Sequence, residues 1–173
     1  MANNIISYNG NNIGKSIKEE DCQIVIKEIF ETSKNYSCSI IFPEDVMIGK
    51  NMNDKSQVKE LNEIKDDDFI LDIGPKTINK ITEIIEISNT ILWNGPAGYF
   101  ENKNFRNGTM SIADIISKNT CDKTLISILG GGDTLAAINL SENKLFFSHL
   151  STAGGAFLEY LEGKDLPGIS VLK

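Results

Sequence analysis

The chain has 173 residues, enough to bury one sizeable core but few for two, so a single domain is expected. Its formal net charge of −7 argues against nucleic acid and membrane surfaces as partners, because both attract basic proteins. A small anionic ligand stays compatible with this charge where backbone amides, local cations or a metal receive it. The three cysteines are scattered without CxxC or Cys/His spacing, which indicates reduced thiols and not a zinc site.

The amino-terminal residues do not resemble a targeting segment. They lack the apolar stretch of a signal peptide, and no apolar run in the sequence approaches the roughly 20 residues that cross a bilayer. We therefore expect a soluble, cytoplasmic protein.

Apolar strand-like runs alternate along the chain with stretches of helical periodicity, which is the pattern of a layered α/β sheet. The expected helices cover residues 21–36, 75–85, 105–117, 133–140 and 153–161. The expected strands cover residues 37–42, 69–74, 90–95, 124–129 and 145–150, with a short extended piece at 46–49. Three of these strands end in the glycine-bearing turns NGPAG, GGGDT and STAGGA. In an open parallel sheet such turns line up at the carboxyl edge, where ligands bind.

Two other stretches look like ligand sites, but we predict that both are structural loops. GNNIGKS, residues 10–16, resembles a phosphate-binding P-loop but has three residues between its glycines where that motif has four. We expect a surface loop after a short helix. The run from Lys65 to Asp68 is expected to be a solvated turn before the strand at 69–74, and not a metal site.

The turn GGGDT has the composition of an anion site. Three glycines, Gly130 to Gly132, allow backbone amides to approach an anion closely, and Asp133 and Thr134 then begin a helix whose free amides attract negative charge. The sequence allows two interpretations of Asp133. It could be the N-cap of the helix, or it could hold Mg²⁺, which prefers one or two carboxylates together with phosphate oxygens.

The two other glycine turns support a nucleotide-type ligand. Asn94 to Gly98 forms a rigid turn able to wall a flat pocket, and Glu101 can accept hydrogen bonds from two ribose hydroxyls. Trp93 and Phe100 are expected to pack in the core. A second anion site is expected where a helix starts at Gly154 and Gly155.

Together, these motifs resemble the C-terminal, nucleotide-binding half of phosphoglycerate kinase. The matching stretches are ILWNGPAGYFE, ILGGGDTLAA and HLSTAGGAFLEYLEGKDLPG, with LDIGPKT and NNIGKS as shorter likenesses, so the resemblance covers nearly the whole chain. It implies that residues 1–173 are a partial C-terminal domain. The implied fold is an α/β, three-layer, Rossmann-like parallel sheet that lacks its first two strands and keeps the last three. We expect residues 1–60, next to the gap, to be displaced, mobile or completed by another chain.

The resemblance implies phosphoryl transfer between ATP and 3-phosphoglycerate, with Mg²⁺ and closure of two domains. Glu101 would bind the ribose, and Asn94, Pro96 and Gly98 would border the nucleotide. The phosphate-binding residues would be Gly131, Gly132, Asp133 and Thr134, of which Asp133 would direct Mg²⁺. Gly154 and Gly155 would face the transferring phosphoryl group in the catalytic role.

The sequence also departs from the family pattern. Ala153 stands where a glycine is expected, which puts the geometry of that anion site in question. His149 lies on a strand, so a packed or hydrogen-bonded histidine is expected and not a catalytic base. The GxKxxxK segment, whose lysines neutralise the nucleotide phosphates, has no counterpart, and neither has the N-terminal half with its basic phosphoglycerate site.

Met1 matches an internal methionine of the family, so the chain looks like a fragment that is inactive alone. Its expected partners are a nucleotide and the missing N-terminal half. The alternatives are a catalytically silent nucleotide-binding module and an inactive remnant of a split gene.

Overall fold

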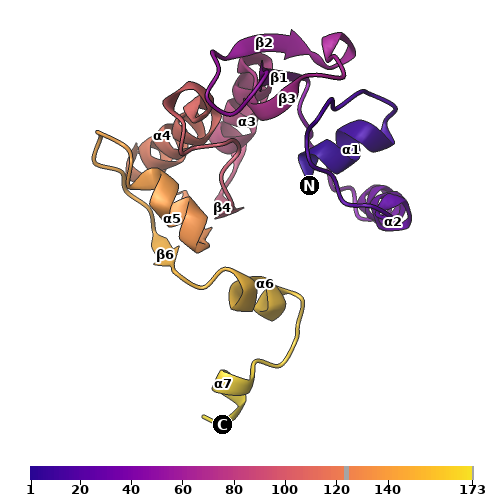
Figure 1. The fold of residues 1–173 in the computed structure, drawn as a ribbon. Helices are drawn as coiled ribbons and strands as arrows, with labels where there is room; N and C mark the ends of the chain where they lie inside the picture. The colour runs from indigo at the N-terminus through magenta and orange to yellow at the C-terminus, as the bar shows by residue number, and fades with distance from the viewer. Residues whose placement is uncertain (123–124, 173) are drawn as a thin grey trace. The chain divides into compact units, whose positions relative to one another are not determined.

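The protein is described here by a computed structural model, which covers residues 1–122 and 125–172. Its helices are α1 (Ala2–Tyr8), α2 (Gln23–Asn35), α3 (Pro75–Ile87), α4 (Asn107–Asp122), α5 (Gly132–Ile138), α6 (Gly155–Leu161) and α7 (Pro167–Ser170), with short 3-10 turns η1 (Leu61–Glu63) and η2 (Lys103–Phe105) (Figure 1). Its strands are β1 (Asp45–Gly49), β2 (Gln57–Glu60), β3 (Phe69–Ile73), β4 (Thr90–Asn94), β5 (Ile126–Gly130) and β6 (His149–Ser151). The chain forms two compact units, one of residues 1–82 and 97–108 and the other of residues 83–96 and 109–173. Among the described residues, no helix is long and apolar enough to cross a membrane.

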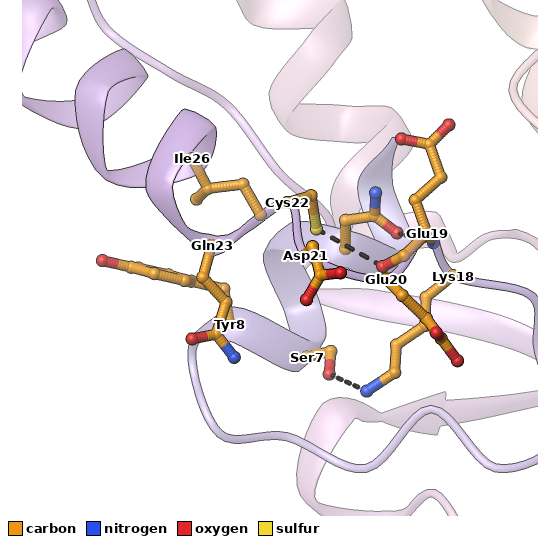
Figure 2. A pocket seen from close by; sticks show the side chains of 10 residues that line it. Ser7, Tyr8, Lys18, Glu19, Glu20, Asp21, Cys22, Gln23 and Ile26 are labelled. Carbon is orange, nitrogen blue, oxygen red and sulfur yellow. Dashed lines mark hydrogen bonds between the residues drawn. The ribbon is translucent and has the colours of Figure 1, made fainter.

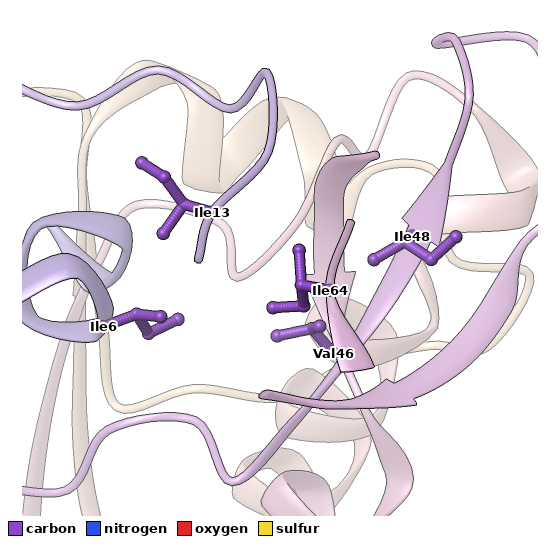
Figure 3. Close-up of a cluster of buried hydrophobic side chains, with 5 residues drawn as sticks. All are labelled: Ile6, Ile13, Val46, Ile48 and Ile64. Atoms are coloured by element: carbon purple, nitrogen blue, oxygen red, sulfur yellow. The ribbon is translucent and has the colours of Figure 1, made fainter. Parts of the chain in front are cut away.

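The first unit contains an antiparallel sheet in the order β2-β1-β3. A hydrophobic core packs on this sheet, and Figure 3 shows side chains from α1, from the loop after it and from the sheet region converging in it. Its buried members are Ile6, Ile13, Val46, Ile48 and Ile64. Residues 1–60 thus supply α1, β1, β2 and four of the five buried members of this core. These elements pack within the first unit, and the expectation that residues 1–60 are displaced, mobile or completed by another chain stays a prediction.

The prediction of a strand at residues 37–42 is wrong, because these residues form no strand. Residues 37–39 are exposed, Ser37 has a left-handed φ of 52°, and no strand forms before Asp45. The short piece at 46–49 is instead part of β1, the central strand. Pro43 has no N–H to donate to a ladder, so the pairing starts beyond it, where Val46 and Ile48 point into the core.

The turn from Lys65 to Asp68 forms as expected, but it is not fully solvated. Asp68 is buried, and its carboxylate pairs with Lys50 and with Lys59, both at 2.7 Å. Burial alone would raise the pKa of Asp68, but the hydrogen bonds from the two lysines outweigh it and hold that pKa below its ordinary value. The loop at 10–16 packs on this turn, because a Cβ on Gly14 would lie 2.2 Å from the carbonyl oxygen of Asp68. The loop is therefore a packed part of the first unit.

The helix α3 is capped by a side chain from the sheet. Asp45 of β1 accepts hydrogen bonds from the backbone N–H of Lys76 at 3.0 Å and of Thr77 at 2.9 Å, so its carboxylate satisfies the free amides at the start of the helix. Pro75 occupies the first helical position, where no N–H is needed. The helix expected from residue 75 is confirmed.

The second unit contains a parallel sheet in the order β4-β5-β6, which confirms the expected Rossmann-like α/β class and the order of these strands. The strands expected at 90–95 and 124–129 are confirmed with small shifts, although Thr124 lies outside the described residues. The strand expected at 145–150 is shorter and starts at His149. Before it, Ser148 and Ser127 each accept the other's backbone N–H through their hydroxyls, so side chains take bonds that a longer ladder would use. The helix α7, which starts at Pro167, was not expected.

Candidate functional site

Two of the predicted glycine turns touch at the carboxyl ends of β5 and β6. The N–H of Gly131 donates to the carbonyl oxygen of Ser151 at 3.2 Å. A Cβ on Gly154 would lie 3.3 Å from the Cα of Gly131, which leaves little room for a side chain. The GGGDT and STAGGA turns therefore lie together at the edge where open parallel sheets bind ligands.

The end of β4 joins the same edge. Gly131 has a φ of 96°, which favours glycine, and a Cβ there would lie 2.8 Å from Asn94 Oδ1. Both the backbone conformation and the lack of space therefore require glycine at this position. The hydroxyl of Thr134 is buried and accepts the N–H of Gly95 at 2.7 Å. Asn94, Gly131 and Thr134, three of the sequence-predicted residues, are thus brought together.

The carboxamide of Asn94 carries an unsatisfied donor. Its Nδ2 is buried and has no hydrogen-bond partner within the described part of the chain. A buried donor without a partner costs about 1–3 kcal/mol, so such an atom next to a glycine turn needs an acceptor. An acceptor on a bound molecule would satisfy it.

Asp133 does not cap α5. The N-cap position is Gly131, which has no side chain to cap the helix. Asp133 is the second residue of α5, and its side chain is exposed. The N-cap interpretation is therefore wrong. Gly132 is also exposed, and a Cβ there would meet nothing within 4 Å. The surface beside these two residues is open.

The start of α6 tolerates the alanine that departs from the family pattern. Ala153 lies outside the left-handed region of φ, so its methyl group causes no backbone strain. Its N–H donates to Ser151 Oγ at 3.2 Å. Gly154 caps the helix, and Gly155 begins it with open space where a Cβ would lie.

Two side chains near these turns have simple structural positions. Trp93 is buried as expected, and its Nε1 donates to the carbonyl oxygen of Gly95 at 2.7 Å. His149 lies on β6 as expected, but its side chain is exposed, so the packed alternative is wrong.

The other predicted nucleotide residues follow β4 along the chain. Pro96 is the last residue of its segment in the second unit, whereas Gly98 and Glu101 belong to the first unit. Gly98 packs on the carboxylate of Asp72. The side chain of Glu101 is exposed, and its carbonyl oxygen accepts from Arg106 Nη2 at 3.3 Å.

Asp72, on β3, is a buried acid that lies outside the three glycine turns. Burial raises its pKa to about 6, although N–H groups of Gly108 and Ile73 donate to its carboxylate and act in the opposite direction. The available signal was an aspartate inside the apolar run FILDIG, where an ionisable side chain is unusual.

The first unit also has a pocket of about 350 Å³ between α1 and the start of α2 (Figure 2). Lys18 Nζ donates to Ser7 Oγ at 3.1 Å in it, and three acidic residues, Glu19 to Asp21, line it. These carboxylates would repel phosphate, and none of the predicted site residues lines the pocket. Within the described residues, no group of three or more His, Cys, Asp or Glu side chains could hold a metal ion.

Comparisons with known proteins find one family. A family model of phosphoglycerate kinase matches residues 1–164. The phosphoglycerate kinase of Francisella philomiragia is 43% identical over 175 residues, which cover 100% of this chain and 44% of that protein. The enzyme of Wolbachia pipientis from Culex pipiens is 42% identical over 173 residues and is covered to 43%.

Solved structures give the same result. The phosphoglycerate kinase of Coxiella burnetii matches with a TM-score of 0.87 at 37% identity, over 99% of this chain and 44% of that one. The kinase of Pyrococcus horikoshii matches with a TM-score of 0.73 at 26% identity, over 99% of this chain and 42% of that one. The chain spans about 44% of the length of these curated relatives. With its family match, its motifs and its fold in agreement, the chain belongs to the phosphoglycerate kinase family.

Proposed function

We propose that residues 1–173 are a partial C-terminal domain that forms the nucleotide-binding portion of a phosphoglycerate kinase. The observation that carries this proposal is the unsatisfied Nδ2 of Asn94, beside the contacting turns of Gly131 and Gly154. A nucleotide offers the acceptors that this donor lacks. Glycine turns at the carboxyl edge of a parallel sheet are suited to its phosphates.

The second unit would bind the phosphates. The exposed Gly132 would leave space for an anion at the start of α5, Gly131 would shape the turn before it, and Thr134 fixes that turn through Gly95. The exposed carboxylate of Asp133 fits Mg²⁺ that arrives with the nucleotide, because this ion takes one or two carboxylates and completes its shell with phosphate oxygens and water. When bound, Mg²⁺ would neutralise charge on the phosphates.

Five further residues are proposed to contact the ligand. Pro96 and Gly98 would border the nucleotide, and the exposed Glu101 carboxylate would accept hydrogen bonds from the ribose hydroxyls. Gly154 and Gly155 would stabilise charge on the transferring phosphoryl group with backbone amides, which is how phosphoryl transfer is catalysed by positioning and electrostatics.

Catalysis would require the other half of the kinase. The reaction of the family, ATP with 3-phosphoglycerate to ADP and 1,3-bisphosphoglycerate in glycolysis, needs a phosphoglycerate site and domain closure. We propose that the N-terminal half of a phosphoglycerate kinase is the partner, in the cytoplasm, and that this chain alone binds nucleotide without turnover. A catalytically silent module and an inactive remnant of a split gene are the alternatives.

Calorimetric titration of MgADP into the full chain tests the proposal. We expect saturable binding that Asn94→Ala weakens roughly tenfold, because the variant loses a hydrogen bond to the ligand. Asn143→Ala is the matched control, since Asn143 is an exposed residue of the same unit and should bind as the wild type does. No saturable heat would favour the remnant. Equal affinities for Asn94→Ala and the control would remove Asn94 from the site.

Phosphoryl transfer from MgATP to 3-phosphoglycerate is assayed in parallel. We expect none from the chain alone and turnover when a separately produced N-terminal half of a relative is added. Nucleotide binding without turnover in that mixture would favour the silent module.

A further inference from the structure

Asp72 connects three segments of the first unit. It lies on β3 with a relative exposure of 2%. Its Oδ2 accepts the N–H of Gly108, in the first turn of α4, at 2.8 Å, and its Oδ1 accepts the N–H of Ile73 at 2.9 Å. The carboxylate thereby satisfies one of the free amides at the start of α4.

Two glycines give this carboxylate its space. A Cβ on Gly98 would lie 2.3 Å from Asp72 Oδ1, and a Cβ on Gly108 would lie 2.4 Å from the same atom. Real Cβ atoms do not approach so closely, so the acid fills the volume that any other residue would occupy at both positions. Next to it, the N–H of Tyr99 donates to the carbonyl oxygen of Leu71 at 2.7 Å. The turn at Gly98 and Tyr99 is therefore held on β3 by a backbone bond and by contact with the carboxylate.

We propose that Asp72 is a positioning residue, which holds the segment Gly98–Glu101 on β3 and against the start of α4 and so places that segment for the nucleotide. The proposal rests on the proposed function where it concerns the nucleotide, since Gly98 and Glu101 border the ligand there. The contacts themselves are independent of any ligand.

The protonation state of Asp72 controls these contacts. An ionised carboxylate can accept both N–H groups, whereas a protonated one turns one oxygen into a donor that faces an N–H. Burial raises the pKa of this carboxyl to about 6. Charged groups on the neighbouring segments are Asp45 on β1 and Glu101, Lys103 and Arg106 before α4, whereas the causes of the shift are burial and the two N–H groups that donate to the carboxylate. We therefore expect the segment to tighten as the pH rises through about 6.

Amide NMR between pH 5 and 8 tests the link without a ligand. We expect the amide shifts of Gly98, Tyr99 and Gly108 to titrate together with a midpoint near 6 in the full chain. A His149→Gln variant should show the same curves, which separates the effect of Asp72 from any effect of the histidine. Titration of Gly108 without Gly98 and Tyr99, or no titration at all, would overturn the positioning role.

The affinity for MgADP at pH 7.5 supplies the second readout. Asp72→Asn keeps the shape but has one acceptor oxygen in place of two, and we expect it to weaken binding roughly tenfold. Asp114→Asn removes an equal charge from an exposed residue of α4 and should bind as the wild type does. Equal affinities for these two variants would overturn the proposal. A wild-type chain that binds no nucleotide would instead refute the proposed function, while the NMR titration would still decide whether Asp72 positions the segment.

Discussion

The hydroxyl of Thr134 accepts the backbone N–H of Gly95 at 2.7 Å, and this bond ties the first turn of α5 to the turn after β4. Thr134→Val keeps the size of the side chain but leaves that part-buried N–H without an acceptor. We expect the free energy of unfolding to fall by about 1–3 kcal/mol in urea denaturation. Thr134→Ser retains the hydroxyl and should lose less. A valine variant as stable as the serine variant would show that the bond contributes little.

Neighbouring glycines of the same turn should respond differently to alanine. Gly131→Ala would force a side chain into a φ of 96° and bring a Cβ within 2.8 Å of Asn94 Oδ1, so we expect it to destabilise the fold by about 1–3 kcal/mol. At Gly132 a Cβ would meet nothing within 4 Å, so Gly132→Ala should keep the stability of the wild type. It should still weaken nucleotide binding, because the methyl group would stand where phosphate approaches. Thermal unfolding and calorimetry on both variants check the contrast, which equal stability losses would contradict.

Binding of ADP with and without Mg²⁺ should show whether Asp133 acts through the metal. Asp133→Asn should weaken MgADP much more than ADP in the presence of EDTA, because an amide is a poor ligand for Mg²⁺. The structure sharpens this test, since Asp133 does not cap α5 and its replacement removes no cap. Asp114→Asn serves as the charge control. The same loss for MgADP and for metal-free ADP would show that Asp133 does not direct the metal.

The ribose hydroxyls should report on Glu101. If its carboxylate accepts both, ADP should bind more tightly than its 2',3'-dideoxy analogue by roughly 1–3 kcal/mol. In Glu101→Gln this preference should shrink, because an amide has one acceptor oxygen where a carboxylate has two. Calorimetry with the two nucleotides measures it. Indistinguishable affinities in the wild type would exclude the carboxylate from ribose recognition.

Stability should fall between pH 5 and pH 7.5 because of Asp72. Its pKa is about 6 in the folded chain against an ordinary 3.8, so the folded state binds the proton more tightly. The stabilisation is therefore complete below pH 3.8 and is lost as the pH rises through about 6. The loss across this window should be about 1 kcal/mol.

Asp72→Asn should remove this slope, whereas Asp114→Asn should keep it. Asp68 acts with the opposite sign, because its pKa is held below 3.8, but its contribution changes only at more acidic pH. Urea titrations at several pH values measure the slope. A slope that persists in Asp72→Asn would assign it to another group.

Much of the second unit could be predicted from the sequence alone. The runs TILWN and ISILG are apolar, β-branched and closed by glycine turns, so local preference and burial agree on parallel strands. The three glycine motifs also identified the family. Their meeting at one edge followed from the rule that parallel strands present their carboxyl ends together.

The first unit depended on contacts between distant residues. Residues 37–42 and 45–49 are both apolar, and only the partners β2 and β3 decided that the second run forms the central strand. Strand preference depends on such partners more than on the residue itself. The burial of Asp68 was likewise hidden, since the two lysines that pair with it lie elsewhere in the chain. For Asp72 the apolar run FILDIG gave a signal, but the sequence did not show that Gly108 donates to it. By itself, the sequence determined the family, the parallel strands and the glycine turns, because these are local patterns. The tertiary structure alone decided the antiparallel sheet and which acids are buried, because a carboxylate can leave water only where distant donors replace it.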